Sequence, residues 1–342
     1  MLAAVLKDFN QLALEDVPKP EPGPGEVQVR IKSCGICATD YKAIKGIRKN
    51  VEFPLIPGHE PAGVIAALGP FVHNTKEGDE VIISPSGFCG VCRNCRLGMT
   101  HYCEHAYTTG GDGYVVRPGS FAEYMLTGAN NVYPKPSSLS FDAACQAEPV
   151  SGAWKGLVHY SQLRLGDDVV VIGTGGIGMY CVLVAKAAGA GCLVAVDVSD
   201  YALEKAKNLG ATHTVNPKHC DAKATIHDIL PEGPDVVVEA AGPIQAVELM
   251  VSLLRRGTRW NLFGITTHEK FQLDGGWMHF LEARMDASFS TNPVAMENAI
   301  RLMARNLVNP EKVISHRFPL SQIAAAIETM GSPQRNKVII NP

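Results

Sequence analysis

Residues 169–178 read VVVIGTGGIG, and this stretch decides the fold of the second half of the chain. Four apolar residues typical of a strand lead directly into three glycines, Gly173, Gly175 and Gly178, and an apolar helical segment follows to about residue 188. In such a strand–turn–helix unit the first glycine permits a tight turn and the second lets the backbone approach a pyrophosphate. The third lets helix and strand pack closely. The pattern therefore predicts a dinucleotide-binding unit.

The residues around these glycines indicate which dinucleotide would bind. Gly176 and Ile177 fall in the first helical turn, whose free N–H groups can bind phosphate oxygens. The next apolar strand, LVAVD, ends at Asp197, close to the roughly 20-residue spacing expected of a carboxylate that accepts the ribose 2′-OH. No arginine follows Asp197 to accept a 2′-phosphate, so we predict NAD rather than NADP. The alternative is a tight turn followed by a solvated carboxylate.

The segments after the glycines continue to alternate between strand and helix. Apolar strands (LVAVD, DVVVEA and TRWNLFGI) alternate with helical segments (DYALEKAKNLG and VELMVSLLRR) up to about residue 290. Wholly apolar strands that alternate with helices pair in parallel and are covered on both faces of the sheet. We therefore predict an α/β fold class, with a doubly wound parallel sheet over residues 151–293.

The first 150 residues have a different pattern. Short β-like runs such as VQVRI (27–31), GVIAAL (63–68) and EVIIS (80–84) are separated by glycine and proline, which is typical of an irregular β domain. Residues 294–342 contain two helical segments and the strand KVIIN, and we expect this tail to complete the first domain. The predicted domains are thus 1–150 with 294–342, and 151–293.

Length and composition limit the class of protein. The 342 residues suffice for two domains, and 46% apolar residues, 19% charged residues and a net charge of −3 give no basic bias that would favour nucleic acid. No apolar run reaches the roughly 18 residues of a membrane span, and the opening MLAAVL is short for a signal peptide. We expect a cytoplasmic protein. Six of its ten cysteines fall in two tight groups, which favours metal binding over disulfides.

The strongest metal signal is the stretch CGVCRNCRLGMTHYC. It contains four closely spaced thiols: Cys89, Cys92, Cys95 and Cys103. Four thiolates at such spacing can close a tetrahedron around zinc and leave no open position, so they predict a structural site. His101 or His105 could replace one thiolate, and a disulfide pair is a further alternative.

A catalytic zinc site needs three protein ligands and an open position for water or substrate. The stretch PGHEPAG offers His59 and Glu60, and QAEPVSG offers Glu148 shortly before the change of domain. Glycine and proline surround these residues, as is typical of functional loops. Taken singly, however, a histidine with satisfied hydrogen bonds, a helix cap or an ion-pair partner explains each of them more readily than a zinc ligand does.

Together these motifs resemble the zinc-dependent medium-chain alcohol dehydrogenase superfamily over essentially the whole chain. Their order is Cys-x-[Thr/Ser]-Asp at 37–40, Gly-His-Glu-x-x-Gly at 58–63, Gly-Asp-x-Val at 78–81, the four cysteines, Gly-Ser-Phe-Ala-Glu-Tyr at 119–124, Glu-Pro at 148–149, and the glycine fingerprint. The resemblance implies a GroES-like catalytic domain around an inserted Rossmann domain. It also implies two zinc ions per chain, one catalytic and one structural, with NAD as the cofactor.

The resemblance assigns roles to individual residues. Cys37 and His59 match zinc ligands, and Asp40 matches the carboxylate that fixes the tautomer of the histidine. The third ligand is Glu148 or Glu60, since Glu-Pro is the pattern of the polyol and threonine dehydrogenase branch. Thr39 matches the hydroxyl that relays the substrate proton, although a helix N-cap is the structural alternative. Cys34 is then a structural thiol rather than half of a redox pair.

The implied reaction is hydride transfer to NAD from a secondary alcohol, namely a polyol, an amino alcohol or a hydroxy acid. A homotetramer or homodimer is expected from the habit of the family. A non-enzymatic nucleotide sensor or structural protein on the same scaffold is the rival, but such proteins usually lose the metal ligands. Residues 108–119 and 266–284, the latter including Trp277 and His279, are candidate walls of the substrate pocket or plain loops.

Two departures from the family pattern affect the expected site. Lys42 stands where relatives carry a relay histidine, and Ala38 replaces an arginine that contacts the cofactor pyrophosphate. Lys42, Lys45 and Lys49 would share one face if this segment were helical. That face is either a solvated surface or the binding site for a phosphate or carboxylate of the substrate.

Overall fold

The computed structural model describes residues 1–111, 115–264 and 270–342, which form two compact units. The first unit comprises Met1–Ser151, Ser290–Asn306 and Ile314–Pro342, and the second comprises Gly152–Phe289 and Leu307–Val313. The sequence predicts Leu307–Val313 as part of the first domain, whereas its contacts place it in the second unit. The predicted pocket walls at 108–119 and 266–284 lie partly outside the described residues, at 112–114 and 266–269. Among the described residues, no helix is long and apolar enough to cross a membrane.

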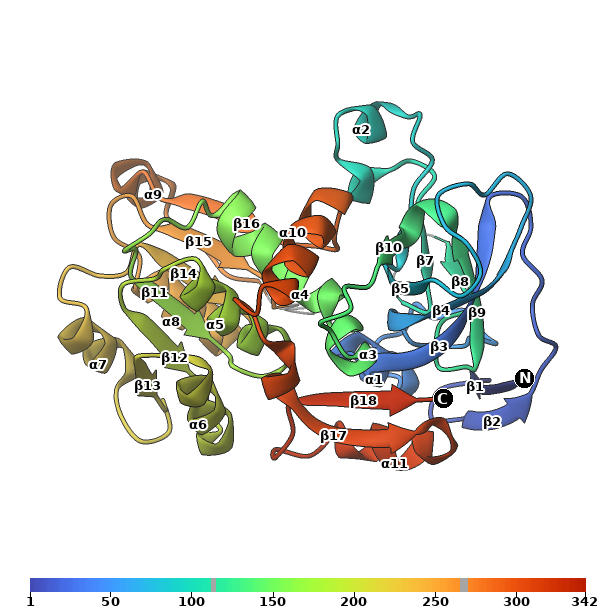
Figure 1. The fold of residues 1–342 in the computed structure, drawn as a ribbon. Coiled ribbons are helices and arrows are strands. Elements are labelled where there is room, and N and C mark those ends of the chain that lie inside the picture. Colours follow the sequence, from blue (N-terminus) through green and yellow to red (C-terminus); the bar gives the residue numbers. More distant parts are fainter. Residues whose placement is uncertain (112–114, 265–269) are drawn as a thin grey trace. The chain divides into compact units, whose positions relative to one another are not determined.

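The second unit is built on a six-stranded sheet in the order β13-β12-β11-β14-β15-β16, with all neighbours parallel (Figure 1). The strands are β11 (Val169–Ile172), β12 (Leu193–Val196), β13 (His213–Val215), β14 (Val236–Glu239), β15 (Arg259–Leu262) and β16 (Arg284–Ala287). Every residue of β11 and β12 is buried, as expected for strands covered on both faces. The strand order reverses at β11, and ligands bind at such a switch point in doubly wound sheets.

Helices follow the strands of this sheet and pack against them. They are α5 (Gly176–Ala187), α6 (Asp200–Leu209), α7 (Ala222–Ile229), α8 (Ile244–Ser252) and α9 (Gly275–Leu281), with a π-helical turn η3 (Lys155–Tyr160) before the sheet. The side chains of Ser199 and Asp221 cap α6 and α7 by accepting backbone N–H bonds. The apolar core between sheet and helices includes the fully buried Trp260.

The first unit is a mainly antiparallel β structure in which the order β10-β5-β4-β3-β18-β17 forms the main sheet, with β9 also paired to β3. These strands are β3 (Glu26–Ile36), β4 (Glu60–Leu68), β5 (Glu80–Ile83), β9 (Tyr124–Gly128), β10 (Val132–Pro134), β17 (Ile314–Pro319) and β18 (Lys337–Asn341). The smaller sheets contain β1 (Leu2–Leu6) with β2 (Leu12–Asp16), and β6 (Ser86–Gly87) with β7 (Tyr107–Thr109) and β8 (Val116–Arg117).

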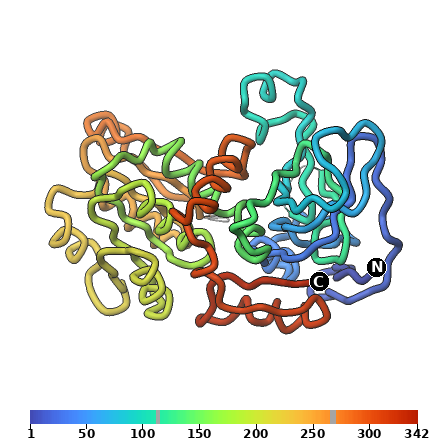
Figure 2. The backbone as a smooth tube through the Cα atoms, viewed as in Figure 1, coloured from blue at the N-terminus to red at the C-terminus, as the bar shows by residue number. Residues whose placement is uncertain are grey.

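The C-terminal tail completes this unit. Strand β18 pairs antiparallel with β3, so the end of the chain runs beside its early strands (Figure 2). A polar cluster joins the same parts, because the carboxylate of Asp142 accepts bonds from Ser33 Oγ (2.6 Å), Arg317 Nε (2.6 Å) and Asn341 Nδ2 (2.9 Å). Both sequence-distant ends are therefore needed to build the first unit.

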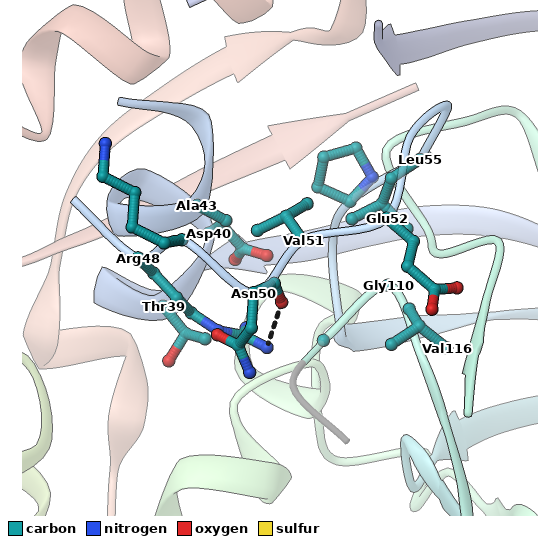
Figure 3. A pocket seen from close by; sticks show the side chains of 13 residues that line it. Thr39, Asp40, Ala43, Arg48, Asn50, Val51, Glu52, Leu55, Gly110 and Val116 are labelled. Carbon is teal, nitrogen blue, oxygen red and sulfur yellow. Dashed lines mark hydrogen bonds between the residues drawn. The ribbon is translucent and has the colours of Figure 1, made fainter. Parts of the chain in front are cut away.

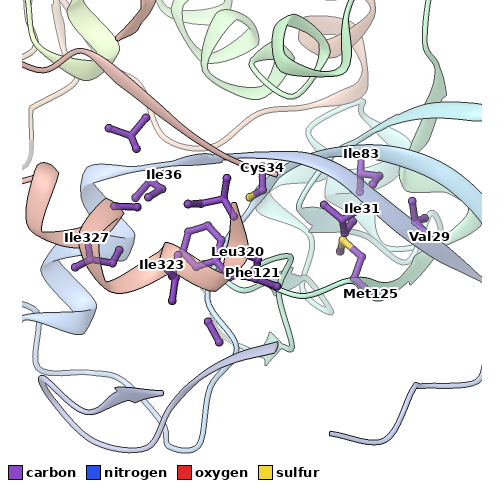
Figure 4. Close-up of a cluster of buried hydrophobic side chains, with 14 of the residues drawn as sticks. Val29, Ile31, Cys34, Ile36, Ile83, Phe121, Met125, Leu320, Ile323 and Ile327 are labelled. Atoms are coloured by element: carbon purple, nitrogen blue, oxygen red, sulfur yellow. The ribbon is translucent and has the colours of Figure 1, made fainter. Parts of the chain in front are cut away.

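Apart from the 12-residue α10, the helices of the first unit are short. The α-helices are α1 (Ala38–Ile44), α2 (Arg93–Arg96), α3 (Phe141–Ala144), α4 (Ala147–Trp154, which ends in the second unit), α10 (Pro293–Ala304) and α11 (Ile323–Thr329). The 3-10 turns of this unit are η1 (Thr100–Tyr102), η2 (Ala129–Asn131) and η5 (Leu320–Gln322). A further 3-10 turn, η4 (Pro310–Val313), lies in the second unit. Side chains from α11 and the sheet meet in a buried core that contains Ile31, Phe121 and Ile323 (Figure 4).

Cys34 is part of this core rather than of an exposed redox pair (Figure 4). Its side chain is fully buried, and its Sγ lies 3.0 Å from Ser120 Oγ. Burial raises the pKa of the Cys34 thiol to about 12. A thiol with this pKa stays protonated and unreactive at neutral pH.

Candidate active site

Strand pairing brings Cys37, His59 and Glu60 together. Cys37 follows the end of β3, Glu60 opens β4, and the cross-strand pair Gly35–Glu60 sets the two segments side by side. One ligand atom from each of the three residues lies within 4.8 Å of the other two. A thiol, an imidazole nitrogen and a carboxylate oxygen are preferred ligands of zinc, so the donor set fits this ion.

Asp40 organises this set from the first turn of α1. Its buried carboxylate accepts the N–H of Cys37 at 2.9 Å and the N–H of Gly58 at 3.2 Å, and it lies 3.1 Å from His59 Nδ1. An ionised carboxylate only accepts, so Nδ1 must carry the hydrogen and Nε2 is left as the ligand atom. Burial lowers the pKa of His59, but the charge and hydrogen bond of Asp40 outweigh burial and hold this pKa well above its ordinary value.

Thr39 stands next to the ligand set. Its Oγ1 accepts a hydrogen bond from Cys37 Sγ at 3.6 Å. The N-cap residue of α1 is Cys37 and not Thr39, so the capping alternative for Thr39 is wrong. The hydroxyl is instead available to the pocket that the side chain lines.

Glu60 has a buried cationic partner that sequence analysis missed. Its carboxylate forms an ion pair with Lys337 at the start of β18, and the two side chains are 1% and 6% exposed. Lys337 Nζ also donates to the carbonyl of Ile36 at 3.2 Å. Space for this pair depends on Gly35, because a Cβ there would lie 2.2 Å from Glu60 Oε2 and 2.5 Å from Lys337 Cε. The only sequence signal was a lone cation beginning an apolar strand.

Glu148, the other candidate third ligand, is not part of this group of atoms. It lies in the first turn of α4, where its carbonyl accepts a bond from Ser151 Oγ at 2.6 Å. Of the two carboxylates named from the sequence, only Glu60 has an oxygen within 4.8 Å of both the Cys37 and His59 donor atoms.

The four cysteines of residues 89–103 form a second donor group. Their Sγ atoms all lie within 4.8 Å of one another, in a lobe that carries α2 and η1 and projects from the first unit (Figure 1). Backbone N–H groups point at the sulfurs, with Cys89 N and His105 N each 3.3 Å from Cys103 Sγ. N–H groups of Cys95 and Glu104 lower the pKa of Cys92 to about 6. Four sulfurs with one stabilised as a thiolate fit a structural zinc.

The glycine fingerprint of the second unit has the predicted local geometry. Gly173 adopts φ +86°, and a Cβ on Gly178 would lie 1.8 Å from the Gly173 carbonyl oxygen. A Cβ at Gly175 or Gly176 would meet no described atom within 4 Å, so the backbone is open there to a ligand. Ile177 follows Gly176 in the first turn of α5. These features fit a phosphate-binding helix N-terminus.

Two carboxylates shape the loops beside the fingerprint. Asp197, just after β12, accepts the N–H of Thr174 at 2.7 Å and that of Ser199 at 2.9 Å, and so ties the fingerprint loop to the end of the next strand. Glu239 ends β14 and accepts the N–H groups of Ala241 and Gly242, each at 2.7 Å. Sequence analysis did not single out Glu239.

A pocket of about 280 Å³ lies beside the ligand set in the first unit (Figure 3). Its walls come from α1, from the segment after α1 and from residues near β8, and the lining residues are Thr39, Asp40, Ala43, Arg48, Lys49, Asn50, Val51, Glu52, Leu55, Pro57, Gly110, Gly111 and Val116. Gly111 lies directly against His59, since a Cβ on it would be 3.3 Å from the Cβ of the histidine. The pocket therefore adjoins the candidate metal ligands.

The predicted face of three lysines does not form. Helix α1 ends at Ile44, and Gly46 turns the chain with φ +68°, so Lys49 lies outside the helix. Lys45 pairs with Glu328 at 2.6 Å, and neither Lys42 nor Lys45 lines the pocket. The cations in the pocket wall are Arg48 and Lys49 instead.

Comparison with known proteins agrees with these observations. Residues 23–137 match the family model described as the alcohol dehydrogenase GroES-like domain, and residues 176–305 match the model described as zinc-binding dehydrogenase. The L-threonine 3-dehydrogenase of Anaeromyxobacter sp. (strain Fw109-5) is 32% identical over 332 residues, which is 96% of this chain and 95% of the relative.

Solved structures with the same fold contain nicotinamide cofactors. A zinc-binding dehydrogenase of Sinorhizobium meliloti 1021 bound to NADP has a TM-score of 0.93 and 28% identity, covering 100% of this chain and 99% of that one. The alcohol dehydrogenase RspB of E. coli CFT073 in complex with NADH has a TM-score of 0.92 and 27% identity, with the same coverage. The predicted resemblance is thus confirmed, and the chain belongs to the zinc-dependent medium-chain alcohol dehydrogenases, a family of alcohol oxidoreductases.

Proposed function

We propose that this protein is an NAD-dependent dehydrogenase that oxidises a secondary alcohol of the polyol, amino alcohol or hydroxy acid class. The observation that carries the proposal is the convergence of Cys37, His59 and Glu60 within 4.8 Å beside a pocket. A purely structural metal site has no need of a pocket, whereas a catalytic site requires one. The threonine dehydrogenase relative favours a small polar alcohol as the substrate.

Cys37, His59 and Glu60 would hold the catalytic zinc, and the four cysteines of residues 89–103 would hold the structural one. When bound, a catalytic zinc supplies Lewis acidity that eases ionisation of an alcohol hydroxyl. Glu148 was the sequence alternative for the third ligand, and we assign that position to Glu60 because its oxygen lies within the donor group.

The protein's own residues prepare the site for this chemistry. Asp40 keeps His59 in the tautomer that presents Nε2, and it orients Cys37 through the backbone N–H. Thr39 lines the pocket, and its hydroxyl is assigned as a relay that takes up the proton of the substrate hydroxyl while passing its own proton to the next group of the relay. Lys42 stands where relatives carry the relay histidine, and it is not among the residues that line the pocket.

The second unit would bind the cofactor through the N-terminus of α5 and the carboxylate of Asp197. A carboxylate after the second strand favours a free ribose 2′-OH and repels a 2′-phosphate, which supports NAD over NADP. The bonds from Thr174 and Ser199 hold this carboxylate beside the fingerprint loop.

Assembly and location extend the proposal. We assign a homodimer or homotetramer, supported by the edge strand β16, where Met285 is 50% exposed and the nearby Phe280 is 71% exposed. Edge strands and exposed apolar residues are typical of surfaces that pair with another chain. None of the ten cysteines, all of which the structure describes, is in a disulfide, which supports a reducing compartment such as the cytoplasm.

A substrate screen with metal analysis tests the proposal. Zinc-loaded protein is offered NAD with polyols, amino alcohols, hydroxy acids and sugar phosphates, and the formation of NADH is followed. We expect turnover of at least one class, about two zinc ions per chain, and loss of one zinc and of turnover in Cys37→Ser. A flat response together with about one zinc per chain would instead indicate the rival, a nucleotide-binding protein without catalysis.

A further inference from the structure

Two loops of the second unit meet at the edge of the sheet where a cofactor binds. In doubly wound sheets ligands bind outside the carboxyl ends of the strands where the strand order reverses, and here those neighbouring strands are β11 and β14. The fingerprint loop follows β11, and residues 240–242 follow β14. The N–H of Ala240 donates to the carbonyl of Ile172 at 2.8 Å, and a Cβ on Gly173 would lie 2.6 Å from the nitrogen of Ala241. Residues 240–242 are therefore the direct neighbours of the fingerprint loop.

A buried carboxyl anchors residues 240–242. Ala241 is exposed and its two neighbours are half-buried, whereas the preceding residue, Glu239, is fully buried. One oxygen of its carboxyl, Oε1, accepts the N–H of Ala241 and the N–H of Gly242, each at 2.7 Å. The segment reads Ala-Ala-Gly and has no side chain larger than a methyl group. Its position must therefore be fixed through its backbone, and Glu239 supplies those bonds.

The same carboxyl is enclosed from the other side by the residues that follow β15. A Cβ on Gly264 would lie 2.2 Å from Glu239 Oε2 and 2.5 Å from the nitrogen of Gly242. The N–H groups of Phe263 and Gly264 donate to the backbone carbonyl of Glu239 at 2.8 Å and 3.0 Å. The Glu239 side chain is thus held between two loops at the carboxyl edge of the sheet, and it has little room to move.

We propose that Glu239 is a positioning residue for the cofactor, because its carboxyl holds residues 240–242 in the conformation in which NAD binds beside them. The inference rests on the proposed function, since it takes the fingerprint loop as the NAD site. Glu239 is buried and acts through the backbone of the loop rather than on the cofactor itself. A loop that is fixed before a ligand arrives loses less conformational freedom on binding, so the affinity is higher.

Two substitutions separate hydrogen bonding from packing. Glu239→Met fills a similar volume but accepts no hydrogen bond from the loop. Glu239→Gln keeps a side-chain oxygen that accepts both N–H bonds. Loss of the charge should matter little, because burial raises the pKa of Glu239 and outweighs the N–H groups that lower it. If positioning depends on these bonds, glutamine replaces glutamate and methionine does not.

Asp168 supplies a matched control at the opposite edge of the same sheet. It lies directly before β11, and its Oδ1 accepts the N–H of Cys192 just before β12 at 2.9 Å. Asp168→Leu therefore removes a bond from a carboxyl to the backbone at the amino ends of the strands, away from the edge where the cofactor binds. It measures how far a general loss of stability in this unit changes NAD binding.

Calorimetric titration with NAD tests the inference on the full chain. We expect Glu239→Met to raise the Kd for NAD by roughly tenfold or more, and Glu239→Gln and Asp168→Leu to stay within about twofold of the wild type. With an alcohol from the screen, Glu239→Met should raise the KM for NAD and leave the KM for the alcohol within about twofold. An unchanged Kd in Glu239→Met would overturn the inference, as would an equal loss in Glu239→Gln or in Asp168→Leu.

Hydrogen exchange of the wild type needs no variant, so it decides if Glu239→Met does not fold. Without NAD, the amides of Ala241 and Gly242 should exchange slowly although Ala241 is exposed, because both are bonded to Glu239. Fast exchange of both amides would overturn the inference. A wild type that binds no NAD would overturn it together with the proposed function. A wild type that binds NAD but oxidises no alcohol would remove the proposed reaction alone and leave the titration to decide on Glu239.

Discussion

Replacing Lys337 by methionine tests how the candidate ligand Glu60 is held. The ion pair between them is almost fully buried, with side chains 6% and 1% exposed. Removal of one partner from a buried ion pair leaves an uncompensated charge and costs about 3–5 kcal/mol. Methionine fills similar volume, so little of this loss would come from a cavity. We therefore expect the free energy of unfolding of the metal-free first unit to fall by about 3–5 kcal/mol.

Two further samples separate charge from packing. In the double variant Lys337→Met/Glu60→Gln no carboxylate is left unpaired, so most of the stability should return. In zinc-loaded Lys337→Met a bound cation would compensate the charge of Glu60, so the loss of unfolding free energy relative to zinc-loaded wild type should be smaller. If Glu60 is not a ligand, zinc leaves the loss unchanged.

Urea unfolding measures these differences. The unfolding is followed by a probe in the first unit, because the two units need not unfold together. A loss below about 1 kcal/mol in metal-free Lys337→Met would refute the buried, charge-dependent ion pair, because a loss of that size is what one ordinary hydrogen bond contributes. A double variant no more stable than Lys337→Met would refute it equally.

Three further predictions concern other parts of the molecule. Gly173→Ala should weaken NAD binding in calorimetry, because a φ of +86° is strained for alanine and the new Cβ would lie 2.6 Å from a backbone nitrogen. Gly166→Ala is the control: Gly166 has a φ of +88° but open space around it, so this variant measures the effect of backbone strain alone. Cys103→Ser should lower zinc content by about one ion per chain and leave the catalytic zinc bound. Burial raises the pKa of Asp142, but its three hydrogen-bond donors outweigh burial and lower this pKa. The ionised Asp142 carboxylate therefore contributes to the free energy of unfolding above the pKa of about 3.9 that it has in the unfolded chain, and this contribution is lost as the pH falls through its pKa in the folded protein. Wild type and Asp142→Asn should accordingly differ in stability at pH 7 and converge in acid.

The features that sequence reasoning anticipated depend on short spacings. The glycine fingerprint and the four cysteines each occupy one local stretch, so their geometry follows from neighbouring residues. The lysine face failed for an equally local reason, because the turn at Gly46 ends α1 before the third lysine. A positive φ at one glycine is not visible in a pattern of charges.

Contacts between distant segments were beyond sequence reasoning. The choice between Glu60 and Glu148 depends on the register of β3 with β4, which places Gly35 opposite Glu60. The partnership of Glu60 with Lys337 depends on the return of β18 to the sheet of the first unit. The return of the tail to the first domain was expected from the sequence, but neither the register of β3 with β4 nor the pairing of β18 with β3 can be read from the spacing of residues along the chain.

The most direct test of the central claim follows the hydrogen that is transferred. An alcohol found active in the screen is prepared with deuterium on its carbinol carbon, and the reduced cofactor is analysed by mass spectrometry. The account predicts that deuterium appears in the nicotinamide of NADH made by the zinc-loaded wild type and that Cys37→Ser makes none. Unlabelled NADH, or unchanged transfer by Cys37→Ser, would contradict it.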